Sequence, residues 1–386
     1  MKPLDALAVP GAAQVWAALP QARIVGGAVR DLLAGLPVGD VDFAVPAPPA
    51  EVIRLLAAAG IRPVPTGIAH GTVTAVVEGR GFEITSLRRD VETDGRHARV
   101  AFTDDWRADA ARRDFTINAM SMTRDGALFD YFGGAADLGA GRVRFVGEAG
   151  ARIAEDYLRI LRFFRFFGRY GKGDPDREAL AAITDLRDGL RQLSAERVWS
   201  EIKRILAAPD PRPVVALMAQ TGVLPLIFTE GADTAALDRL VAAGAPPEPL
   251  LRVAALLRGD AARFAERLRL SGGEAAALAA YRAPMGLAPG ASEAALRRAL
   301  ADEPAPVLLA RSWLAGDAGP GWQALRAKIA AMPRPVYPLR GRDILALGVP
   351  PGAEVGRRLE AVRAWWREDG CAAGHARCLE QARRLG

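Results

Sequence analysis

The sequence is poor in cysteine, histidine and long apolar runs, and each shortage excludes a class of protein. Two cysteines in 386 residues exclude a disulfide scaffold and favour a reducing compartment, so we expect a cytoplasmic protein. Three histidines leave little material for a histidine-built metal site, so carboxylates are the expected metal ligands, which favours Mg²⁺. We find neither an apolar run of about eighteen residues nor a signal peptide, and we expect no membrane association.

Lysine is also scarce, because arginine supplies nearly all of the positive charge. Lysine accounts for only four of the 51 basic residues, at positions 2, 172, 203 and 328. Against 45 acidic residues this leaves a net charge of +6. A basic surface made of guanidinium groups suits phosphate and nucleic-acid partners.

The length of 386 residues exceeds one ordinary domain, and the pattern changes along the chain. Up to about residue 137 it indicates mixed α/β structure: strands at 23–25 and 41–45, helices at 28–34 and 51–59, and a hairpin joining 71–77 to 81–87. From residue 148 onward the chain is rich in Ala, Leu and Arg with helical periodicity. Expected breaks lie at 171–175, 209–213, 245–249, 284–290 and 333–338.

Two aspartates, Asp40 and Asp42, are the first candidates for chemistry. Strand positions separated by one residue face the same side, roughly 6–7 Å apart, so the two carboxylates could share divalent cations. Two-metal phosphoryl transfer needs such a pair, since one ion activates the attacking hydroxyl and the other holds the triphosphate. Taken alone, such a pair is more commonly a solvated strand start, because acids are mostly exposed.

Two further blocks surround this pair. Gly26 and Gly27 at a strand-to-helix turn would let phosphate oxygens approach backbone N–H groups, and Arg30 is placed for a bidentate phosphate contact. A lone Gly-Gly is more often a plain turn. The second block, residues 112–120, sets Arg113, Asp114 and Asn118 among apolar neighbours. Buried polar groups need partners, so we expect an internal network there, the alternative being a helix start with incidental charges.

In order and spacing, the three blocks resemble the class II CCA-adding tRNA nucleotidyltransferases and their relatives, the bacterial poly(A) polymerases. The resemblance implies an α+β protein: a polymerase β-like nucleotidyltransferase head with a mixed sheet, followed by an all-α neck, body and tail. In it Asp40 and Asp42 would be catalytic and hold Mg²⁺. Glu83 is a candidate third carboxylate, although a surface strand glutamate is the ordinary interpretation.

The resemblance also assigns nucleotide-binding roles. Gly26, Gly27 and Arg30 would bind the nucleotide triphosphate, and Arg113 would contact the nucleotide. It further implies a head at 1–137, a neck at 138–206, a body at 207–335 and a tail at 336–386.

Residues 155–167 predict one strong helix, in which Asp156 and Arg159 share a face and Arg162 and Arg165 continue at a spacing of three. The segment resembles the family's base-recognition helix. This implies that Asp156 and Arg159 hydrogen-bond the Watson–Crick edge of C or A, so that side chains replace a template, while Arg162 and Arg165 serve the phosphates. The alternative is a surface Asp–Arg pair of little energetic value. We expect the phenylalanines at 163–167 in the core.

Three other segments resemble the family. Residues 194–201 have the pattern of a Ser-capped helix and would support the neck. The polar segment 88–105, with Asp-Gly-Arg-His at 94–97, stands where the family has a flexible loop that helps to switch between C and A. Residues 339–356 resemble the tail segment that grips RNA, and Arg357 and Arg358 could meet phosphates there, a solvated basic helix end being the alternative.

Cys371, His375 and Cys378 fall at helical spacing on one predicted helix face. Structural zinc needs a fourth ligand, so we expect no metal there. Residues 230–330 indicate only helical scaffold.

The expected function is Mg²⁺-dependent addition of C, C and A to tRNA 3′ ends from CTP and ATP, the 3′-hydroxyl attacking the α-phosphate in line and pyrophosphate leaving. A poly(A) polymerase, or an enzyme adding only CC or only A, is the alternative. A catalytically inactive RNA-binding protein would not need Asp40, Asp42 and Arg113. A small-molecule nucleotidyltransferase would not need the long arginine-rich remainder, which suits a large polyanion. No protein partner is implied.

Overall fold

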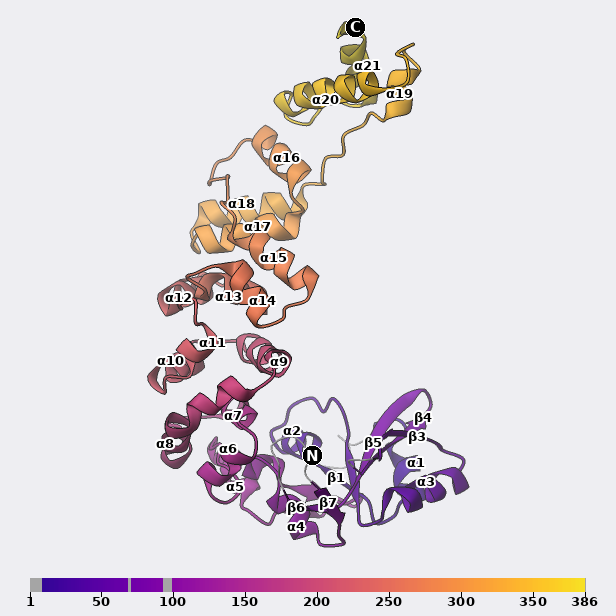
Figure 1. The fold of residues 1–386 in the computed structure, drawn as a ribbon, viewed down its shortest axis with the longest axis vertical. Helices are drawn as coiled ribbons and strands as arrows, with labels where there is room; N and C mark the ends of the chain where they lie inside the picture. The colour runs from indigo at the N-terminus through magenta and orange to yellow at the C-terminus, as the bar shows by residue number, and fades with distance from the viewer. Residues whose placement is uncertain (1–8, 69–70, 93–98, 386) are drawn as a thin grey trace. The chain divides into compact units, whose positions relative to one another are not determined.

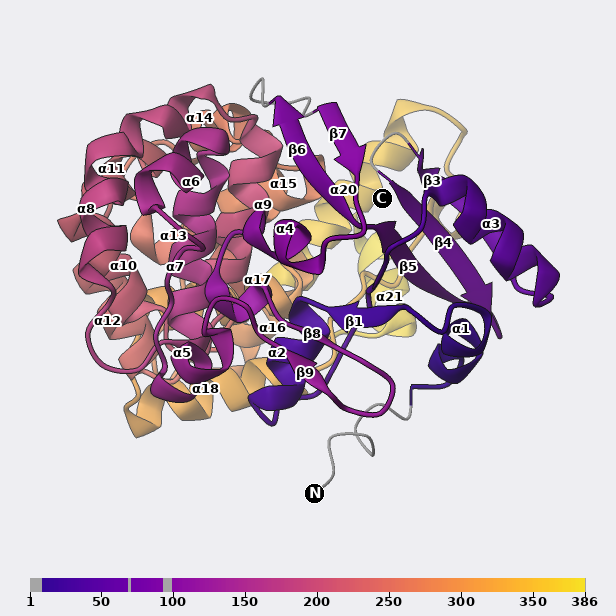
Figure 2. The same ribbon diagram turned by 90° about the horizontal axis from the view of Figure 1, so that it is seen from below.

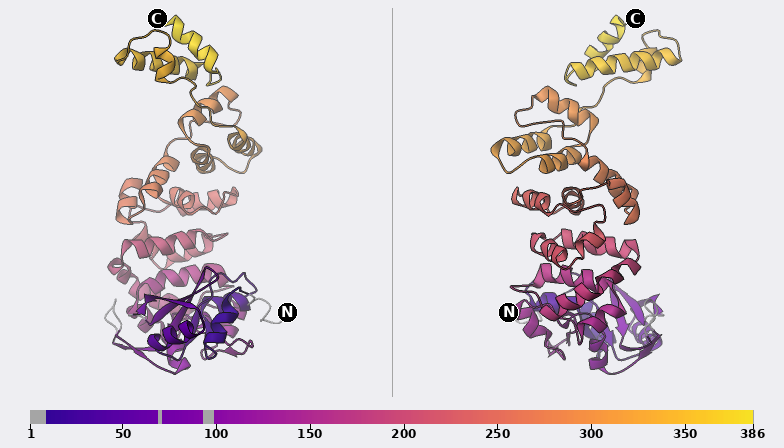
Figure 3. Two further views of the ribbon diagram at one scale, coloured as in Figure 1. Left: turned by 90° about the vertical axis from the view of Figure 1, so that its right-hand side faces the viewer. Right: turned by 60° about the vertical axis from the view of Figure 1, so that its left-hand side comes forward.

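The computed structural model describes residues 9–68, 71–92 and 99–385. The chain divides into two compact units: the first contains residues 1–208 and 213–227, and the second contains residues 209–212 and 228–386 (Figure 1). The strands lie in the indigo-to-magenta part of the chain, while the orange and yellow part is made of helices (Figure 3). The predicted order, a mixed head followed by a helical remainder, is therefore confirmed.

In the part of the chain that the structure describes, seven strands form one mixed sheet in the order β3-β4-β5-β2-β1-β8-β9. The strands are β1 (Arg23–Val25), β2 (Phe43–Val45), β3 (Arg62–Gly67), β4 (Thr72–Val77), β5 (Arg80–Ser86), β8 (Ser121–Met122) and β9 (Leu128–Phe129). The β2–β5 pair is parallel and the other neighbours are antiparallel. Two more strands, β6 (Arg88–Glu92) and β7 (Arg99–Phe102), form a separate hairpin.

The predicted hairpin is present as β4 and β5. Val77 pairs with Arg80, so the connection has two residues, Glu78 and Gly79, with φ of 51° and 79°. Positive φ at both positions is the turn geometry that matches the twist of a hairpin, and glycine reaches it without strain. The strand expected at 41–45 is shorter than predicted, because β2 begins at Phe43. The backbone remains paired just before it, since the carbonyl of Asp42 accepts a hydrogen bond from the Val25 N–H at 3.0 Å.

One face of the sheet carries the head's core. Phe43 and Phe82 are buried there, with ring centroids 6.1 Å apart. Trp16 of α1 (Ala12–Ala18) meets Phe43 edge-on at 5.1 Å. The helix α3 (Pro49–Ala58) lies beside β3 and β4 (Figure 2). Side chains alternate along a strand, so Asp42 and Glu83, next to Phe43 and Phe82, face the opposite side and are exposed.

The first unit continues through short helices to a helical region. These elements are α2 (Gly27–Leu33), α4 (Trp106–Ala111), the 3₁₀ turn η3 (Thr116–Asn118), α5 (Gly134–Ala140), α6 (Ala149–Glu155), α7 (Leu158–Tyr170), α8 (Arg177–Leu186), the 3₁₀ turn η4 (Arg187–Gln192), α9 (Ala195–Leu206), α10 (Arg212–Gln220) and α11 (Leu224–Ile227).

The prediction of one helix over 155–167 is wrong, because the helical structure is interrupted between α6 and α7. Asp156 is extended there, at φ −157° and ψ 104°. Its carboxylate accepts the Leu158 N–H at 3.1 Å, which is how aspartate competes with helix continuation.

Three of the four phenylalanines of α7 lie in the core, as expected, whereas Phe167 is only half-buried. Phe163 and Phe164 are fully buried, and Phe166 is 4 % exposed. Phe115 lies 5.3 Å from Phe166 and 6.4 Å from Phe163 between ring centroids. The aromatic side of α7 thus packs against the segment 112–120, which brings two of the predicted functional blocks together.

The second unit is a series of helices: α12 (Thr234–Ala242), α13 (Pro249–Leu256), α14 (Ala261–Arg267), α15 (Gly272–Arg282), α16 (Glu293–Asp302), α17 (Ala305–Ala315), α18 (Pro320–Ala331), α19 (Gly341–Leu345), α20 (Ala353–Glu368) and α21 (His375–Arg384). The breaks expected at 171–175, 245–249, 284–290 and 333–338 fall between or at the ends of helices, whereas α10 begins inside the one expected at 209–213. Residues 339–382 have an apolar cluster of their own, around Ile344, Val362 and Trp366. Among the described helices, none is long and apolar enough to cross a membrane.

Two local predictions need correction. Cys371, His375 and Cys378 do not share a helix, because α20 ends at Glu368, Cys371 lies in a turn with φ of 57°, and α21 begins at His375. The segment 88–105 is not a plain loop, since it begins with β6 and includes β7. Its Asp-Gly-Arg-His sequence at 94–97 lies outside the described residues.

Candidate active site

One cavity of about 690 Å³ in the first unit brings together most of the predicted site residues. Its lining comes from β1, α2, the segment before β2, the 113–118 segment, α7 and α9. The residues are Val25, Gly26, Gly27, Arg30, Asp40, Asp42, Arg113, Asp114, Asn118, Asp156, Leu158, Arg159, Arg162, Arg165, Phe166, Arg197 and Arg204. Of the predicted site residues only Glu83 is absent from this lining.

The acidic pair lies at one side of this cavity. Asp40 and Asp42 are exposed while Val41 between them is buried, so the two carboxylates do share a face as predicted. Although Asp42 as a residue is exposed, its pKa is raised chiefly by desolvation of the carboxyl group at the cavity wall, then by repulsion from Glu83 and from Asp40. Arg113 opposes these effects. Glu83 is therefore an electrostatic neighbour of Asp42. Carboxylates that repel one another in this way form a region that a divalent cation would stabilise.

Gly26 makes the turn from β1 into α2. Its φ of 63° lies in the region that favours glycine, and a Cβ there would come within 3.0 Å of Nη1 of Arg113. The Gly26 N–H donates to the carbonyl of Met120 at 3.2 Å, which ties the turn to β8. Gly27 begins α2 as its first residue. The predicted strand-to-helix turn is confirmed, and it needs glycine at position 26.

Arg30 is more deeply held than its predicted phosphate role suggests. It is 8 % exposed, and its Nη1 donates to Oδ1 of Asn118 at 2.5 Å. Its Nε and Nη2 both donate to Oδ1 of Asp31, at 3.1 and 3.0 Å. The Tyr170 hydroxyl donates to the same carboxylate oxygen, and the Arg30 guanidinium lies 4.5 Å from the Tyr170 ring centroid. Arg30 lines the cavity, but protein groups already hold its guanidinium.

The internal network expected around Asp114 is present. Its Oδ1 accepts the Phe115 N–H at 2.9 Å and Nδ2 of Asn118 at 3.0 Å. Its Oδ2 accepts Nε and Nη2 of Arg162 at 2.8 and 2.5 Å. Burial alone would raise the pKa of Asp114, but Arg162 and the two N–H donors together hold it below its usual value. Arg162, predicted as a phosphate contact, is thus an ion-pair partner of Asp114.

A second aspartate, which the sequence analysis missed, positions Arg113. Asp109 of α4 is 3 % exposed and accepts Nη2 of Arg113 at 3.2 Å and Nη2 of Arg112 at 2.7 Å. Burial would raise the pKa of Asp109, yet the two arginines and the Arg88 N–H lower it. Arg113 is thereby anchored at one end while it borders the cavity. The sequence indicates this pairing only through helical spacing, since Asp109 precedes Arg112 and Arg113 by three and four residues.

Asp156 and Arg159 both line the cavity, but not as a pair on one helix face. Oδ2 of Asp156 accepts Nη2 of Arg197 at 2.7 Å. Nη1 of Arg159 donates instead to Oε2 of Glu155 at 2.6 Å and to the carbonyl of Arg152 at 2.8 Å. Because the helix breaks at Asp156, each of the two side chains takes its orientation from a different partner.

The helix α9 contributes more than the expected structural support. Glu201 is 3 % exposed and accepts Nε of Arg165 at 2.6 Å, so Arg165 is also paired rather than free for a phosphate. Arg197 and Arg204, seven residues apart on α9, line the cavity and were missed by the sequence analysis, although helical periodicity places them on one face. Ser194 stands at the N-cap position, but its side chain makes no capping hydrogen bond.

Comparisons with known families agree with this geometry. Residues 22–144 match the model of the poly A polymerase head domain. Residues 174–234 match the model described as the probable RNA and SrmB-binding site of polymerase A. The first match contains the acidic pair, the glycine turn and Arg113, and the second contains α9 with Arg197.

The chain is also similar to characterised proteins over most of its length. It is 39% identical over 369 residues to CCA tRNA nucleotidyltransferase 1, mitochondrial, of Mus musculus, a match covering 90% of this chain and 83% of that protein. Over a shorter stretch of 207 residues it is 39% identical to the CCA-adding enzyme of Geobacillus thermodenitrificans, a match covering 53% of this chain and 50% of that protein. Among solved structures, the Bacillus stearothermophilus CCA-adding enzyme in complex with CTP superposes with a TM-score of 0.75 at 25% identity, covering 97% of this chain and 98% of that one.

Proposed function

The chain belongs to the family of CCA tRNA nucleotidyltransferases, and we propose that it adds C, C and A to tRNA 3′ ends from CTP and ATP, with release of pyrophosphate. One observation carries this proposal: a single cavity is bordered both by a carboxylate pair and by side chains suited to read a base. The first set suits phosphoryl transfer, and the second suits a choice between nucleotides without a template.

The acidic side of the cavity has the donors that Mg²⁺ prefers. No cluster of three or more His, Cys, Asp and Glu side chains suited to a metal occurs in the described ranges 9–68, 71–92 and 99–385. Mg²⁺ is commonly held by one or two carboxylates together with substrate phosphates, so Asp40 and Asp42 would suffice, with Glu83 as a further candidate. When bound, the ion neutralises charge on the triphosphate and lowers the pKa of the attacking hydroxyl.

The protein's own groups would position the nucleotide. Arg113, anchored by Asp109, offers its guanidinium to the nucleotide, and the Gly26–Gly27 turn allows close approach of the triphosphate to the backbone. Arg30, Arg162 and Arg165 are ion-paired with Asp31, Asp114 and Glu201. We therefore assign them an electrostatic and positioning share of phosphate binding.

Base selection would rest on Asp156 and Arg159. A carboxylate oxygen accepts from the exocyclic amine of C or A, and a guanidinium donates to a ring acceptor. Arg197 and Glu155 hold these two side chains in place. U and G present the opposite donors and acceptors at those edges, and a site built from fixed polar groups discriminates strongly against such mismatches.

The second unit is the proposed tRNA-binding part. It carries 23 Lys and Arg against 18 Asp and Glu, whereas the first unit carries 28 against 27. Nearly all of the net positive charge therefore lies in the helical unit, where it would attract the phosphates of a large RNA. The tail segment 339–356 belongs to this unit, as do Arg357 and Arg358, which are paired with Glu354 at 2.6 and 3.8 Å. The cytoplasmic location stays a prediction, since the mouse relative is named mitochondrial.

The direct test is extension of a tRNA transcript that lacks its 3′ CCA, with Mg²⁺ and CTP, ATP or both, resolved at single-nucleotide length. Addition of three residues with both nucleotides is the expected result. Two residues with CTP and no further A would indicate a CC-adding enzyme, and a long ladder with ATP alone would indicate a poly(A) polymerase. No extension in any reaction would contradict the proposal.

A further inference from the structure

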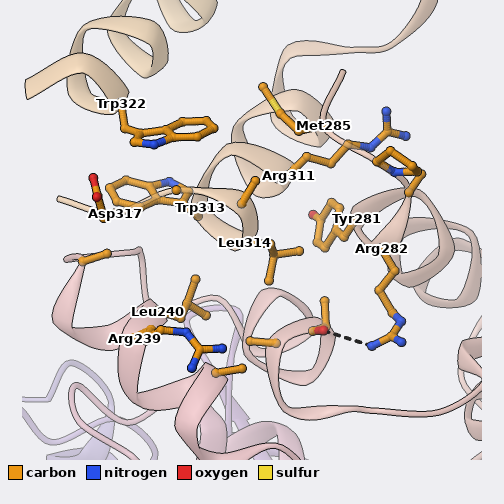
Figure 4. Close-up of a pocket in the computed structure, with 18 of the residues that line it drawn as sticks. Arg239, Leu240, Tyr281, Arg282, Met285, Arg311, Trp313, Leu314, Asp317 and Trp322 are labelled. Carbon is orange, nitrogen blue, oxygen red and sulfur yellow. Dashed lines mark hydrogen bonds between the residues drawn. The ribbon is translucent and has the colours of Figure 1, made fainter. Parts of the chain in front are cut away.

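A second cavity, of about 840 Å³, lies within the helical unit and plays no part in the proposed chemistry. Its walls come from α12, α13, α15, α17 and the start of α18, together with the loops at 283–285 and 316–318. Trp313 and Trp322 lie on one side, and Tyr281 lies across from them (Figure 4). Such a volume exceeds that of a single side chain, and the cavity is open to solvent at its rim, where Arg239 is exposed.

The aromatic side chains of this cavity are held in place by their neighbours. A Cβ at Gly316 would come within 2.3 Å of the Trp322 ring, so the indole packs directly against the glycine backbone. The guanidinium of Arg326 lies 3.5 Å from the Trp313 ring centroid. Arg326 is itself 6 % exposed and donates to the carbonyls of Ser312 and Asp317, both at 2.9 Å. These contacts fix the two indole rings of Trp313 and Trp322 in the cavity wall and leave the cavity open.

Some polar side chains at the cavity already have protein hydrogen-bond partners, and others have donors left for a ligand. Arg282 caps the end of α13, donating to the carbonyls of Ala254, Leu257, Arg258 and Gly259. Arg311 donates to the carbonyl of Ala280 at 2.6 Å and to Glu303 at 2.7 Å. For Arg239 and for the Tyr281 hydroxyl, we find no hydrogen bond or ion pair within residues 9–68, 71–92 and 99–385.

The charge at the cavity is positive. Arg311 is neutralised by Glu303, which leaves Arg239 and Arg282 against the one lining acid, Asp317. Arg282 is held by carbonyls, which satisfy its donors without cancelling its charge. The whole unit has an excess of five positive charges. A concave, positive surface with half-buried aromatic rings along its wall is a combination that can bind an unpaired nucleotide, because every base has a face that stacks and every nucleotide has a phosphate that pairs with arginine.

We propose that this cavity receives one unpaired nucleotide of the RNA substrate, its base against Trp313 and Trp322 and its phosphate at Arg239. The Tyr281 hydroxyl would hydrogen-bond the edge of the base. This inference rests on the proposed function, since it takes an RNA as the substrate. It adds a recognition site in the helical unit that is separate from the nucleotide cavity of the first unit. A protein partner fits less well, because it would have to satisfy the uncompensated positive charge.

The test compares two cavity variants with a matched surface variant in the full-length protein. Arg239→Ala removes the proposed phosphate contact and Tyr281→Phe removes only a hydroxyl. Arg263→Ala removes an equally exposed arginine, on α14, that does not line the cavity. We expect Arg239→Ala to weaken binding of tRNA lacking CCA about fivefold and to reduce the slope of log affinity against log salt by about one. Tyr281→Phe should weaken binding about threefold, and Arg263→Ala less than twofold.

Chemical probing of the bound tRNA supplies a readout that a purely structural role would not change. In the wild-type complex one unpaired base should be protected, and it should become reactive again with Trp322→Ala, whose folding is checked by circular dichroism. Arg263→Ala should keep the kcat at saturating tRNA and the KM for CTP within twofold of wild type.

The outcomes separate this inference from the proposed function. If the wild-type protein extends tRNA but no unpaired base is protected, or if Arg239→Ala binds tRNA like Arg263→Ala, the cavity is not a nucleotide site and the function still holds. If tRNA binds with one base protected but is never extended, the proposed function fails while the cavity assignment stands. Unchanged tRNA binding in all the cavity variants would assign the cavity to another partner and overturn the inference.

Discussion

The two units of the protein hold their arginines in partly different ways. Around the catalytic cavity of the first unit, Arg113, Arg162 and Arg165 each pair with a buried carboxylate, at Asp109, Asp114 and Glu201. In the helical unit, Arg267 and Arg311 also pair with carboxylates, but the buried Arg326 and the half-buried Arg282 donate to backbone carbonyls. Both arrangements satisfy the guanidinium donors, but only the first cancels the charge.

This difference matches two tasks of an enzyme that acts on RNA. Carboxylate partners fix the direction of each guanidinium, and fixed groups are what selection between two similar nucleotides requires. Carbonyl partners leave a positive field that attracts a large polyanion with little demand on exact geometry. The comparison therefore predicts that mutations in the first unit change catalysis and nucleotide choice, while those in the second change RNA affinity.

The strongest test of this division is Asp42→Asn. Loss of a carboxylate that we propose holds Mg²⁺ should reduce kcat for CTP addition by about a thousandfold or more, because metal-ion stabilisation supplies several kcal/mol of the barrier reduction. The Kd for tRNA should change less than twofold. The folded protein should gain stability, because burial and like charges raise the pKa of Asp42 and its ionised form is therefore disfavoured. Glu51→Gln, at an exposed carboxylate paired with Arg54, is the matched control and should behave like wild type.

Asp114→Asn should break the buried network beside the cavity. Removing one partner of such a pair leaves Arg162 uncompensated, at a cost of about 2 kcal/mol once the partial exposure of Arg162 is taken into account. Urea denaturation measures this change in the free energy of unfolding. Asp188→Asn, in an exposed pair with Arg191, should cost less than about 0.5 kcal/mol. Equal losses in the two variants would contradict the role given to the network.

The same carboxylates predict how stability depends on pH. Asp109 and Asp114 both have pKa values below the usual range in the folded protein, and in the unfolded chain an aspartate titrates near about 3.9. Their stabilising contribution is therefore present above about pH 4 and is lost as the pH falls through the folded pKa values. Denaturation curves recorded from neutral to acidic pH should show this loss in wild type and a smaller one in Asp114→Asn.

Arg197→Ala tests whether the first unit controls the choice of nucleotide. Without Arg197, Asp156 loses the partner that orients it. A hydrogen bond to a charged group contributes about 1.5 kcal/mol, so the KM for CTP and ATP should rise about tenfold. UTP should also be misincorporated more often. Single-nucleotide kinetics measure both effects, and the Kd for tRNA should stay constant. Arg191→Ala, on an exposed ion pair of the same region, should leave every value unchanged.

The smallest expected effect belongs to Tyr170→Phe. The variant keeps the ring beside Arg30 but removes the hydroxyl that donates to Asp31. A single hydrogen bond contributes about 1 kcal/mol, so kcat/KM for CTP should fall about threefold with a similar small loss of stability. The shift of the Tyr170 pKa to about 12, caused by burial and then by Asp31, keeps the hydroxyl protonated through neutral pH. A loss greater than about thirtyfold would mean that this hydroxyl contacts the substrate.

Much of the site could be predicted because its motifs are local. Asp40 and Asp42 lie just before β2, but both border the cavity while Val41 between them is buried, as the alternation expected from their spacing predicts. Gly26 adopts the positive φ that its place between strand and helix requires. The network around Asp114 followed from the rule that polar groups among apolar neighbours need partners. The order of a mixed head and a helical remainder followed from periodicity alone.

Other features were decided by contacts between distant parts of the chain. The helical pattern of 155–167 hid the break at Asp156, whose carboxylate caps Leu158 and pairs with Arg197, 41 residues away. Arg162 and Arg165 looked free for phosphates, yet Asp114 and Glu201 hold them, 48 and 36 residues away in sequence. The sequence by itself determined the residue types, their local periodicity and the motifs of the site. Only the tertiary structure decided which charge pairs with which, because that depends on distances that packing sets and that sequence spacing does not contain.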